Sequence, residues 1–174
     1  MNPTESLVRD FQSLVAQVPD LVQPFIVMLA AAIPFIEGEG ASPIGVLGGI
    51  HPVAAAVAAA IGNFLCVLVV VLLGSRIRTA ATRRRALRAV PATAAATAKP
   101  ESKGRQRFRR FVVRFGVPGA SILGPLAIPT QFTSAILIGS GIPRGRVLLW
   151  QGVAIVIWTT LTTTLAWGLL STVA

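Results

Sequence analysis

The amino-acid sequence predicts an all-α integral membrane protein with two inverted halves. Each half is a re-entrant helical hairpin followed by one transmembrane helix, and an N-terminal amphipathic helix precedes them. Hydrophobic residues make up 53% of the 174 positions. Four long stretches contain no Asp, Glu, Lys or Arg, at residues 21–36, 40–75, 115–143 and 147–174. A soluble domain of this length cannot bury so much uncharged sequence, so we expect a bilayer to cover it.

Residues 1–19 contain the predicted amphipathic helix, which we place at 3–18. Asn2 is a favourable N-cap, and Pro3 suits the first helical position. Apolar residues recur on one helical face, namely Leu7, Phe11, Leu14, Val15 and Val18. We expect this face to lie in the membrane interface and the helix to end at Pro19.

The first half covers residues 20–75 and divides into a hairpin at 21–50 and a transmembrane helix at 52–74. The apolar arm 21–36 leads into a segment rich in Gly and Pro. Two arms of about 11–15 residues reach only about 17–22 Å at 1.5 Å per residue, so they enter the bilayer and return. The 23 residues of 52–74 suffice to cross it, and Arg76 follows as a basic stop.

Residues 76–114 form the predicted basic cytoplasmic loop and amphipathic segment. The window from Arg76 to Arg146 holds fifteen of the sixteen Lys and Arg and one acid, a net charge of +14. The remainder has one cation and five acids, a net charge of −4. Cations accumulate on the cytoplasmic side of a membrane, so the charge indicates orientation. We expect no nucleic-acid partner, because the run at 83–85 lacks interleaved aromatic residues.

The second half covers residues 115–174, with a hairpin at 115–143 and a transmembrane helix at 147–171. Glycines and prolines break the first segment repeatedly. If 115–143 folds back, Arg144 and Arg146 join the other cations on the cytoplasmic side; if it spans, they lie on the opposite side. The hairpin interpretation makes the halves inverted, and paired broken helices of this kind point to a transport site at the membrane midplane.

Glu37 and Glu39 are the candidate proton- or cation-coupling residues. They directly follow the 16-residue apolar arm, at the predicted tip of the first hairpin. Acidic side chains at membrane depth are costly and by default suggest a proton or cation site. Two carboxylates this close repel, so one is expected to hold a proton at neutral pH. The alternative is an ordinary surface loop between two helices.

Several other polar residues are candidates for the same region. Arg114 adjoins the second hairpin and is a candidate for an ion pair or a headgroup contact; the alternative is an interfacial arginine extended towards water. Four more residues are candidates to line a cavity, namely Asn63, Ser121, Thr130 and Gln131. Their alternative role is to satisfy backbone groups freed by prolines or to join helices.

The sequence contains no pattern typical of an enzyme. It has one His and one Cys, so neither a metal-ligand cluster nor a disulfide framework is expected. Nucleophile-elbow and phosphate-loop motifs are absent. We therefore expect no catalysis, no cofactor and no metal.

Two segments carry a family resemblance: Ile-Pro-Phe-Ile-Glu-Gly-Glu-Gly-Ala-Ser-Pro-Ile-Gly at 33–45 and Arg-Phe-Gly-Val-Pro-Gly at 114–119. The chain resembles the small multidrug export (efflux) protein family, which is distantly similar to the DedA / VTT-domain superfamily. The resemblance implies opposed re-entrant hairpins and proton-coupled movement of a lipid carrier. It implies that the acids correspond to Glu37 and Glu39, and the arginine to Arg114. A second arginine usual in those proteins is replaced here by Ser121.

These observations predict a small, multi-pass secondary transporter of the inner (plasma) membrane that is coupled to protons. Its expected substrate is a small amphipathic molecule for export or a lipid carrier, and its expected partners are membrane lipids. The alternative is a non-transport membrane scaffold that docks on lipids or a partner through its basic loop. Two spans and two hairpins form a small enclosure, a size compatible with a homodimer.

Overall fold

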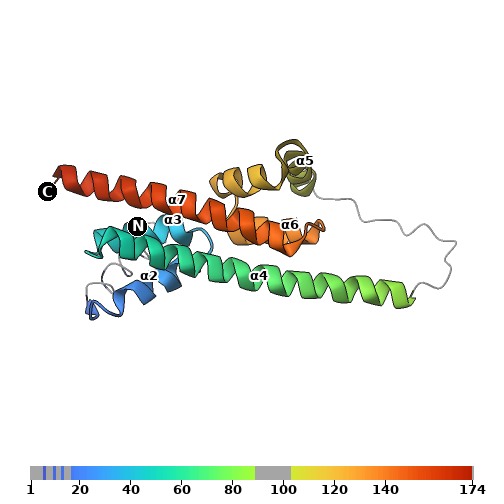
Figure 1. Cartoon of the computed structure of the whole chain (residues 1–174), viewed down its shortest axis with the longest axis horizontal. Helices are drawn as coiled ribbons and strands as arrows, with labels where there is room; N and C mark the ends of the chain where they lie inside the picture. The colour runs from blue at the N-terminus through green and yellow to red at the C-terminus, as the bar shows by residue number, and fades with distance from the viewer. Residues whose placement is uncertain (1–5, 7–9, 11–12, 14–16, 89–102, 174) are drawn as a thin grey trace.

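A computed structural model describes residues 17–88 and 103–173, together with Ser6, Asp10 and Ser13. Apart from those three residues and 17–19, the predicted amphipathic helix at 1–19 lies outside the described residues. The described part of the chain contains helices and no strand, which confirms the all-α class. In chain order the helices are α2 (Gln23–Ala31), α3 (Glu37–Leu47), α4 (Pro52–Arg88), α5 (Lys103–Leu123), the 3-10 turn η1 (Gly124–Leu126), α6 (Thr130–Gly139) and α7 (Arg144–Val173) (Figure 1).

The long helices α4 and α7 run side by side in opposite directions, and the shorter helices pack around them (Figure 1). Each contains a stretch that is long and apolar enough to cross a membrane, Pro52–Arg84 in α4 and Arg144–Thr172 in α7. These two stretches include the predicted transmembrane helices at 52–74 and 147–171. By length and composition, the two helices therefore suit a membrane.

Helix α4 continues fourteen residues beyond Gly74, where the sequence analysis ended it. The extension, residues 75–88, contains neither Gly nor Pro and is rich in Ala and Arg, which favour helix. At the other end of the predicted loop, α5 already begins at Lys103. The segment predicted as a loop at 76–114 is thus helical at both ends, and residues 89–102 lie outside the described part.

The first predicted hairpin, 21–50, contains two short antiparallel arms, α2 and α3, that pack on each other. At nine and eleven residues, they are about 14 and 17 Å long, less than a bilayer core. The turn between them is centred on Pro34 and uses a left-handed backbone at Phe35 (φ 72°). The sequence predicts the tip of the hairpin at Glu37 and Glu39, whereas in the structure the turn at Pro34 follows the first arm and Glu37 begins the second.

The second predicted hairpin, 115–143, is broken at two places. Helix α5 kinks at Gly116, whose φ of 69° and ψ of −172° are accessible to glycine at little cost. After this kink, α5 ends at Leu123 and η1 leads through Pro129 into the ten-residue helix α6. The two short helical pieces resemble in length the arms of the first hairpin.

Small residues let the first hairpin approach α4 closely. Its core is rich in alanine, with Ala30, Ala31, Ala41, Ala55, Ala58 and Ala59 all buried. At Gly62 of α4, an added Cβ would collide with the main chain of Met28 in α2. Close backbone approach through small residues is the way that helices pack inside lipid, where dispersion replaces the hydrophobic effect.

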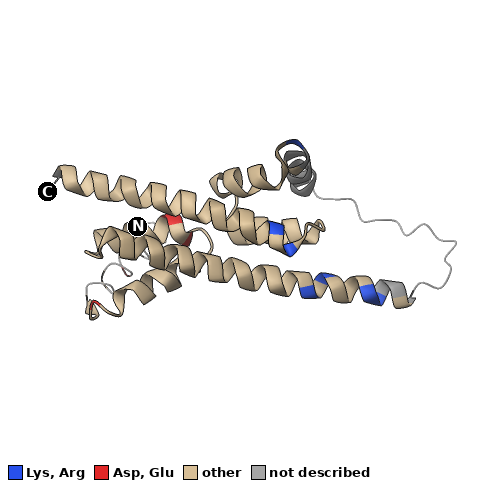
Figure 2. Cartoon of the chain, viewed as in Figure 1, with Lys and Arg blue, Asp and Glu red and all other residues tan. Residues whose placement is uncertain are grey.

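Large apolar side chains cover the outside of the long helices. On α4 they recur at helical spacing, at Val53, Val57, Ile61, Leu65 and Val69, each at least 44% exposed. On α7 the corresponding residues include Leu149, Val156, Leu161, Leu165 and Leu169. A water-soluble monomer rarely presents apolar patches of this extent. The described arginines of α4 and α7, by contrast, gather at the end of the molecule where α4 finishes and α7 begins (Figure 2).

We expect Gly62→Ala to destabilise the protein, because the new methyl group meets backbone that cannot rotate away. Overpacking of this kind costs about 1–3 kcal/mol. The measurement is thermal unfolding of the full chain in detergent, followed by tryptophan fluorescence. Gly168→Ala is the matched control, since a Cβ at Gly168 in α7 meets nothing within 4 Å. Equal melting temperatures for the two variants would contradict the predicted close packing of α2 on α4.

Candidate functional site

Glu37 lies where the two hairpins meet, and its carboxyl group accepts two hydrogen bonds from Thr130. The backbone N–H and the hydroxyl of Thr130 each donate to Glu37 Oε1 at 2.7 Å. Thr130 is the first residue of α6, so its N–H has no acceptor within its own helix. Glu37 therefore caps the N-terminus of α6, where the helix dipole favours negative charge. The side chain is only 2% exposed.

Asn63 of α4 extends this contact into a network of buried polar groups. Its Oδ1 lies 3.1 Å from Thr130 Oγ1 and 3.4 Å from Gln131 Nε2. Three of the four residues predicted to line a cavity, Asn63, Thr130 and Gln131, are thus brought together with Glu37. The network joins α3 and α4 to α6, which is distant from both in the sequence but adjacent to α4 in the fold.

A cavity of about 430 Å³ opens beside Glu37. Glu39, which is half-buried, also lines it and lies close enough to Glu37 for the two carboxyl groups to interact electrostatically. The opposite wall is the turn between α5 and α6, from Pro125 to Pro129, and Thr162 of α7 completes it. Among the described residues that line this cavity there is no lysine, arginine or histidine.

The site lies near the middle of both long apolar segments. Asn63 is the twelfth of the 23 residues from Pro52 to Gly74. Gly38, next to Glu37, packs so tightly on Thr159 that a Cβ would collide with the Thr159 hydroxyl. Thr159 is the thirteenth of the 25 residues from Val147 to Ser171. Two independent helices therefore place Glu37 at half their apolar length.

Contacts between the hairpin turns and α7 hold the site together. The rings of Phe35 and Phe132 are tilted by 53° with centroids 6.3 Å apart, a favourable aromatic geometry. Trp158 Nε1 donates to the carbonyl of Ile122 at 2.8 Å, near the end of α5. Glu37 itself has a positive φ of 51°, a strained backbone for a residue with a side chain. The surrounding packing fixes this conformation.

The proton count of the network depends on the state of Glu37. One hydroxyl carries one proton, so Thr130 cannot donate to Glu37 and to Asn63 at once. If Glu37 is ionised, Thr130 donates to it and must accept from the Asn63 amide. If Glu37 is protonated, it can donate to Thr130, which then donates to Asn63 Oδ1. A proton on Glu37 thus reverses the direction of hydrogen bonding as far as Asn63.

The amide of Gln131 takes part in the same reversal. In the arrangement with Asn63 as acceptor, Gln131 Oε1 is buried without a hydrogen-bond partner. When Asn63 turns its amide towards Thr130, its second N–H can donate to Gln131 Oε1, provided that the Gln131 amide also turns. The network therefore has two arrangements that differ by one proton.

The remaining two candidates are placed differently. The structure does not bring Arg114 to either glutamate; it is exposed, with its guanidinium 5.4 Å from the centroid of the Phe115 ring. Arg114 precedes the kink at Gly116, whereas the residues that reach the site, Pro125 to Thr130, follow it. Ser121 is fully buried, but its hydroxyl has no hydrogen-bond partner and does not join the network.

Sequence reasoning missed one polar residue of the interior. Gln151 of α7 is fully buried, and neither end of its amide has a partner. The hydroxyls of Ser134 and Thr159 are buried without partners as well. The signal for Gln151 was present, because a glutamine inside the apolar segment 147–158 is as unusual as Asn63 in 52–74. Such groups are costly to bury and favour binding of a polar molecule.

No protein family model matches the chain, and no curated protein or solved structure matches it.

We expect Thr130→Val to destabilise the protein by about 1–3 kcal/mol, because a buried acceptor loses its hydroxyl donor. The loss is expected to be larger at pH 8 than at pH 5, since a hydroxyl donor stabilises a carboxylate more than a carboxylic acid. Thermal unfolding of the full chain at both pH values measures it. Thr130→Ser keeps the hydroxyl and is expected to stay near the parent. A pH-independent loss would mean that Thr130 does not act through Glu37.

Proposed function

We propose that this protein is a small secondary transporter of the inner (plasma) membrane and that Glu37 carries the proton that drives it. The single observation behind this proposal is a carboxyl group that is buried at mid-length of two apolar helices and opens onto a cavity without a lining cation. Burial without a cation disfavours the ionised form, so such a group binds and releases protons as its surroundings change.

The arrangement of the helices supports two inverted re-entrant hairpins in the membrane. The turn of α2–α3 and the turn of α5–α6 meet at Glu37 and Thr130. The first hairpin precedes α4 and the second precedes α7, and these two helices run in opposite directions, as two inverted halves require. The arginines at the end of α4 and the start of α7 orient that end towards the cytoplasm. Substrate sites of inverted-repeat transporters lie where such broken helices meet.

The cavity favours a small amphipathic cation as the substrate over a phosphate-headed lipid. Its volume falls within the range of small-molecule sites. Two carboxyl groups supply negative charge, while Phe35, Leu126 and Ile128 supply apolar surface. Arg114, the residue proposed for a phosphate headgroup, is not at this cavity. A proton that neutralises Glu37 lowers the affinity of the cavity for a cation. Binding of the proton and binding of the substrate therefore exclude each other, which allows the protein to exchange one for the other.

The resemblance to the small multidrug export family implies export, and its distant similarity to the DedA / VTT-domain superfamily implies proton-coupled movement of a lipid carrier. Membership of that family stays a prediction. It rests on the segments around Glu37 and Arg114. Of these, the first lies at the proposed site and the second does not. The proposed function therefore depends on the geometry at Glu37 and Thr130.

We expect Glu37→Gln to abolish proton-coupled flux in proteoliposomes. The full chain is reconstituted with a pH-sensitive dye inside, and flux is followed with ethidium and, separately, with a fluorescently labelled phospholipid. We predict at least about a tenfold loss of pH-dependent ethidium flux for Glu37→Gln, equivalent to 1.4 kcal/mol or more. Glu39→Gln is expected to lose less, because its side chain is half-buried, and the double variant to match Glu37→Gln.

Asp20→Asn is the matched control for this experiment, since Asp20 is an exposed carboxylate outside the site. It is expected to keep the parental flux. Ethidium flux that is unchanged in Glu37→Gln would refute the carboxylate mechanism. Movement of the labelled phospholipid without ethidium flux would refute the cation as substrate.

We also expect Arg114→Cys and Arg144→Cys to be labelled from the same side of the membrane. Each is made in a Cys66→Ala background and treated with an impermeant maleimide in intact and permeabilised cells. Both are expected to react only after permeabilisation, whereas Ser171→Cys, at the other end of α7, is expected to react in intact cells. Labelling of the two arginine positions from opposite sides would mean that 115–143 spans the membrane.

A further inference from the structure

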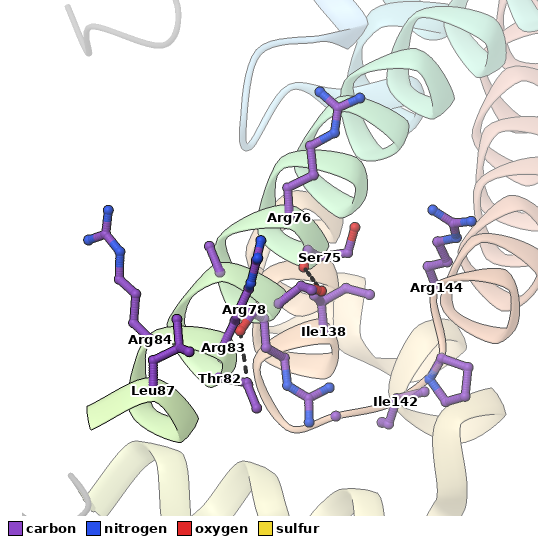
Figure 3. Close-up of a pocket in the computed structure, with 14 residues that line it drawn as sticks. Ser75, Arg76, Arg78, Thr82, Arg83, Arg84, Leu87, Ile138, Ile142 and Arg144 are labelled. Atoms are coloured by element: carbon purple, nitrogen blue, oxygen red, sulfur yellow. Dashed lines mark hydrogen bonds between the residues drawn. The ribbon is translucent and has the colours of Figure 1, made fainter. Parts of the chain in front are cut away.

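A second cavity lies at the end of the molecule where α4 finishes and α7 begins. Along α4 it is far from Asn63, the residue of that helix that belongs to the Glu37 site. It has a volume of about 920 Å³ and is bounded by residues 75–87 of α4 on one side (Figure 3). The other side is the turn from α6 to α7, with Ile138, Ile142 and Pro143, and the first residue of α7. Neither the proposed proton site nor its cavity shares a residue with it.

Among the described residues, five arginines line this cavity and no acidic residue does. Four come from α4, namely Arg76, Arg78, Arg83 and Arg84, and Arg144 comes from the start of α7. The N-terminal end of α7 adds the positive end of a helix dipole next to Arg144. The described part of the wall therefore concentrates positive charge without a carboxylate to compensate it, which favours an anionic ligand.

Arg78 is held against the turn by a specific backbone feature. A Cβ on Gly141 would lie 2.5 Å from Arg78 Nη2, so the absence of a side chain there makes room for the guanidinium. Gly141 has a φ of 98°, which favours glycine in any case.

The alternative role for Arg78, capping the end of α6, is already filled by the backbone. Gly141 N–H donates to Ile138 O at 3.0 Å and Ile142 N–H donates to Leu137 O at 3.3 Å. Ser140 N–H donates to Ile136 O at 2.9 Å. These bonds satisfy the carbonyls of residues 136–138 in the manner of a glycine C-cap, so those three carbonyls do not require the guanidinium. The charge of Arg78 remains available to a ligand.

We propose that this cavity binds the phosphate diester headgroup of an anionic phospholipid. The inference rests on the proposed membrane location, because residues 75–79, which include Arg76 and Arg78, directly follow the apolar segment 52–74 and so lie at headgroup depth. Arginine is the side chain best suited to phosphate, since its planar guanidinium can form two parallel hydrogen bonds. Basic cavities between helices at the cytoplasmic interface are typical headgroup sites.

The apolar part of the wall distinguishes a lipid from free phosphate. Ile138, Ile142 and Leu87 lie beside the arginines in the same cavity. An inorganic anion gains nothing from these side chains, whereas a phospholipid places its glycerol and first acyl carbons on them. The combination of guanidinium groups with adjacent apolar surface therefore matches an amphipathic anion.

The test measures lipid binding to the full chain in detergent by native mass spectrometry. Phosphatidylglycerol is compared with phosphatidylcholine of the same acyl chains and, in a thermal-shift arm, with sodium phosphate. We expect phosphatidylglycerol to bind preferentially and Arg78→Gln to weaken its binding at least about fivefold, the ratio for the loss of about 1 kcal/mol. Arg146→Gln is the matched control, because Arg146 is exposed at the same end but does not line the cavity.

Each other outcome overturns the proposal. Equal effects of Arg78→Gln and Arg146→Gln would indicate unspecific surface charge. Equal binding of the two lipids would exclude recognition of the anionic headgroup, and stabilisation by sodium phosphate alone to the same degree would assign the site to a free anion. Glu37→Gln is expected to bind phosphatidylglycerol normally. Loss of flux with intact lipid binding, or the reverse, therefore shows which of the two proposals has failed.

Discussion

The removal of one carboxyl group from water is the constraint on which the rest of this structure depends. Glu37 is buried, and an ionised carboxylate without partners in such a place would cost several kcal/mol. The N-terminus of α6 supplies what the carboxylate needs, a free backbone N–H and a hydroxyl on the same residue, Thr130. Pro129 contributes indirectly, because it begins α6 at the position where Thr130 faces the glutamate.

Neither half of the chain can build this site alone. The first half brings the acid, on α3, and Asn63, on α4; the second half brings Thr130 and Gln131 from α6. Glycines make the meeting possible, since Gly38 lets α3 lie against Thr159 of α7 and Gly62 lets α2 lie against α4. The polar network therefore depends on the close packing of the helices, and a substitution that pushes the helices apart also lengthens the hydrogen bonds of the network.

Charge divides the molecule by function. Glu37 and Glu39 are at mid-length, where a proton on Glu37 can change the direction of a hydrogen-bonded network. Arginines are at one end, where Arg78 and its neighbours form a cavity suited to a phosphate. Between these two regions the long helices present apolar side chains outward. A membrane fits all three zones at once, because its core, its headgroups and its charge asymmetry have the same order along the helix axes.

The sequence by itself determined the all-α class, the two long apolar helices and the two broken segments, because apolar run length and glycine and proline positions act locally. It also singled out Glu37, since an acid after sixteen apolar residues is conspicuous in any fold. Sequence patterns placed the first break too late, because Gly38 and Gly40 are helical in α3, where α7 packs closely against Gly38. They also ended α4 too early, because a helix can continue beyond its apolar segment. Only the tertiary structure decided that Thr130 faces Glu37, that Arg114 does not, and that Gln151 is buried. Those outcomes depend on where the kink at Gly116 and the turns at Pro34 and Pro129 direct the chain, which no local pattern specifies.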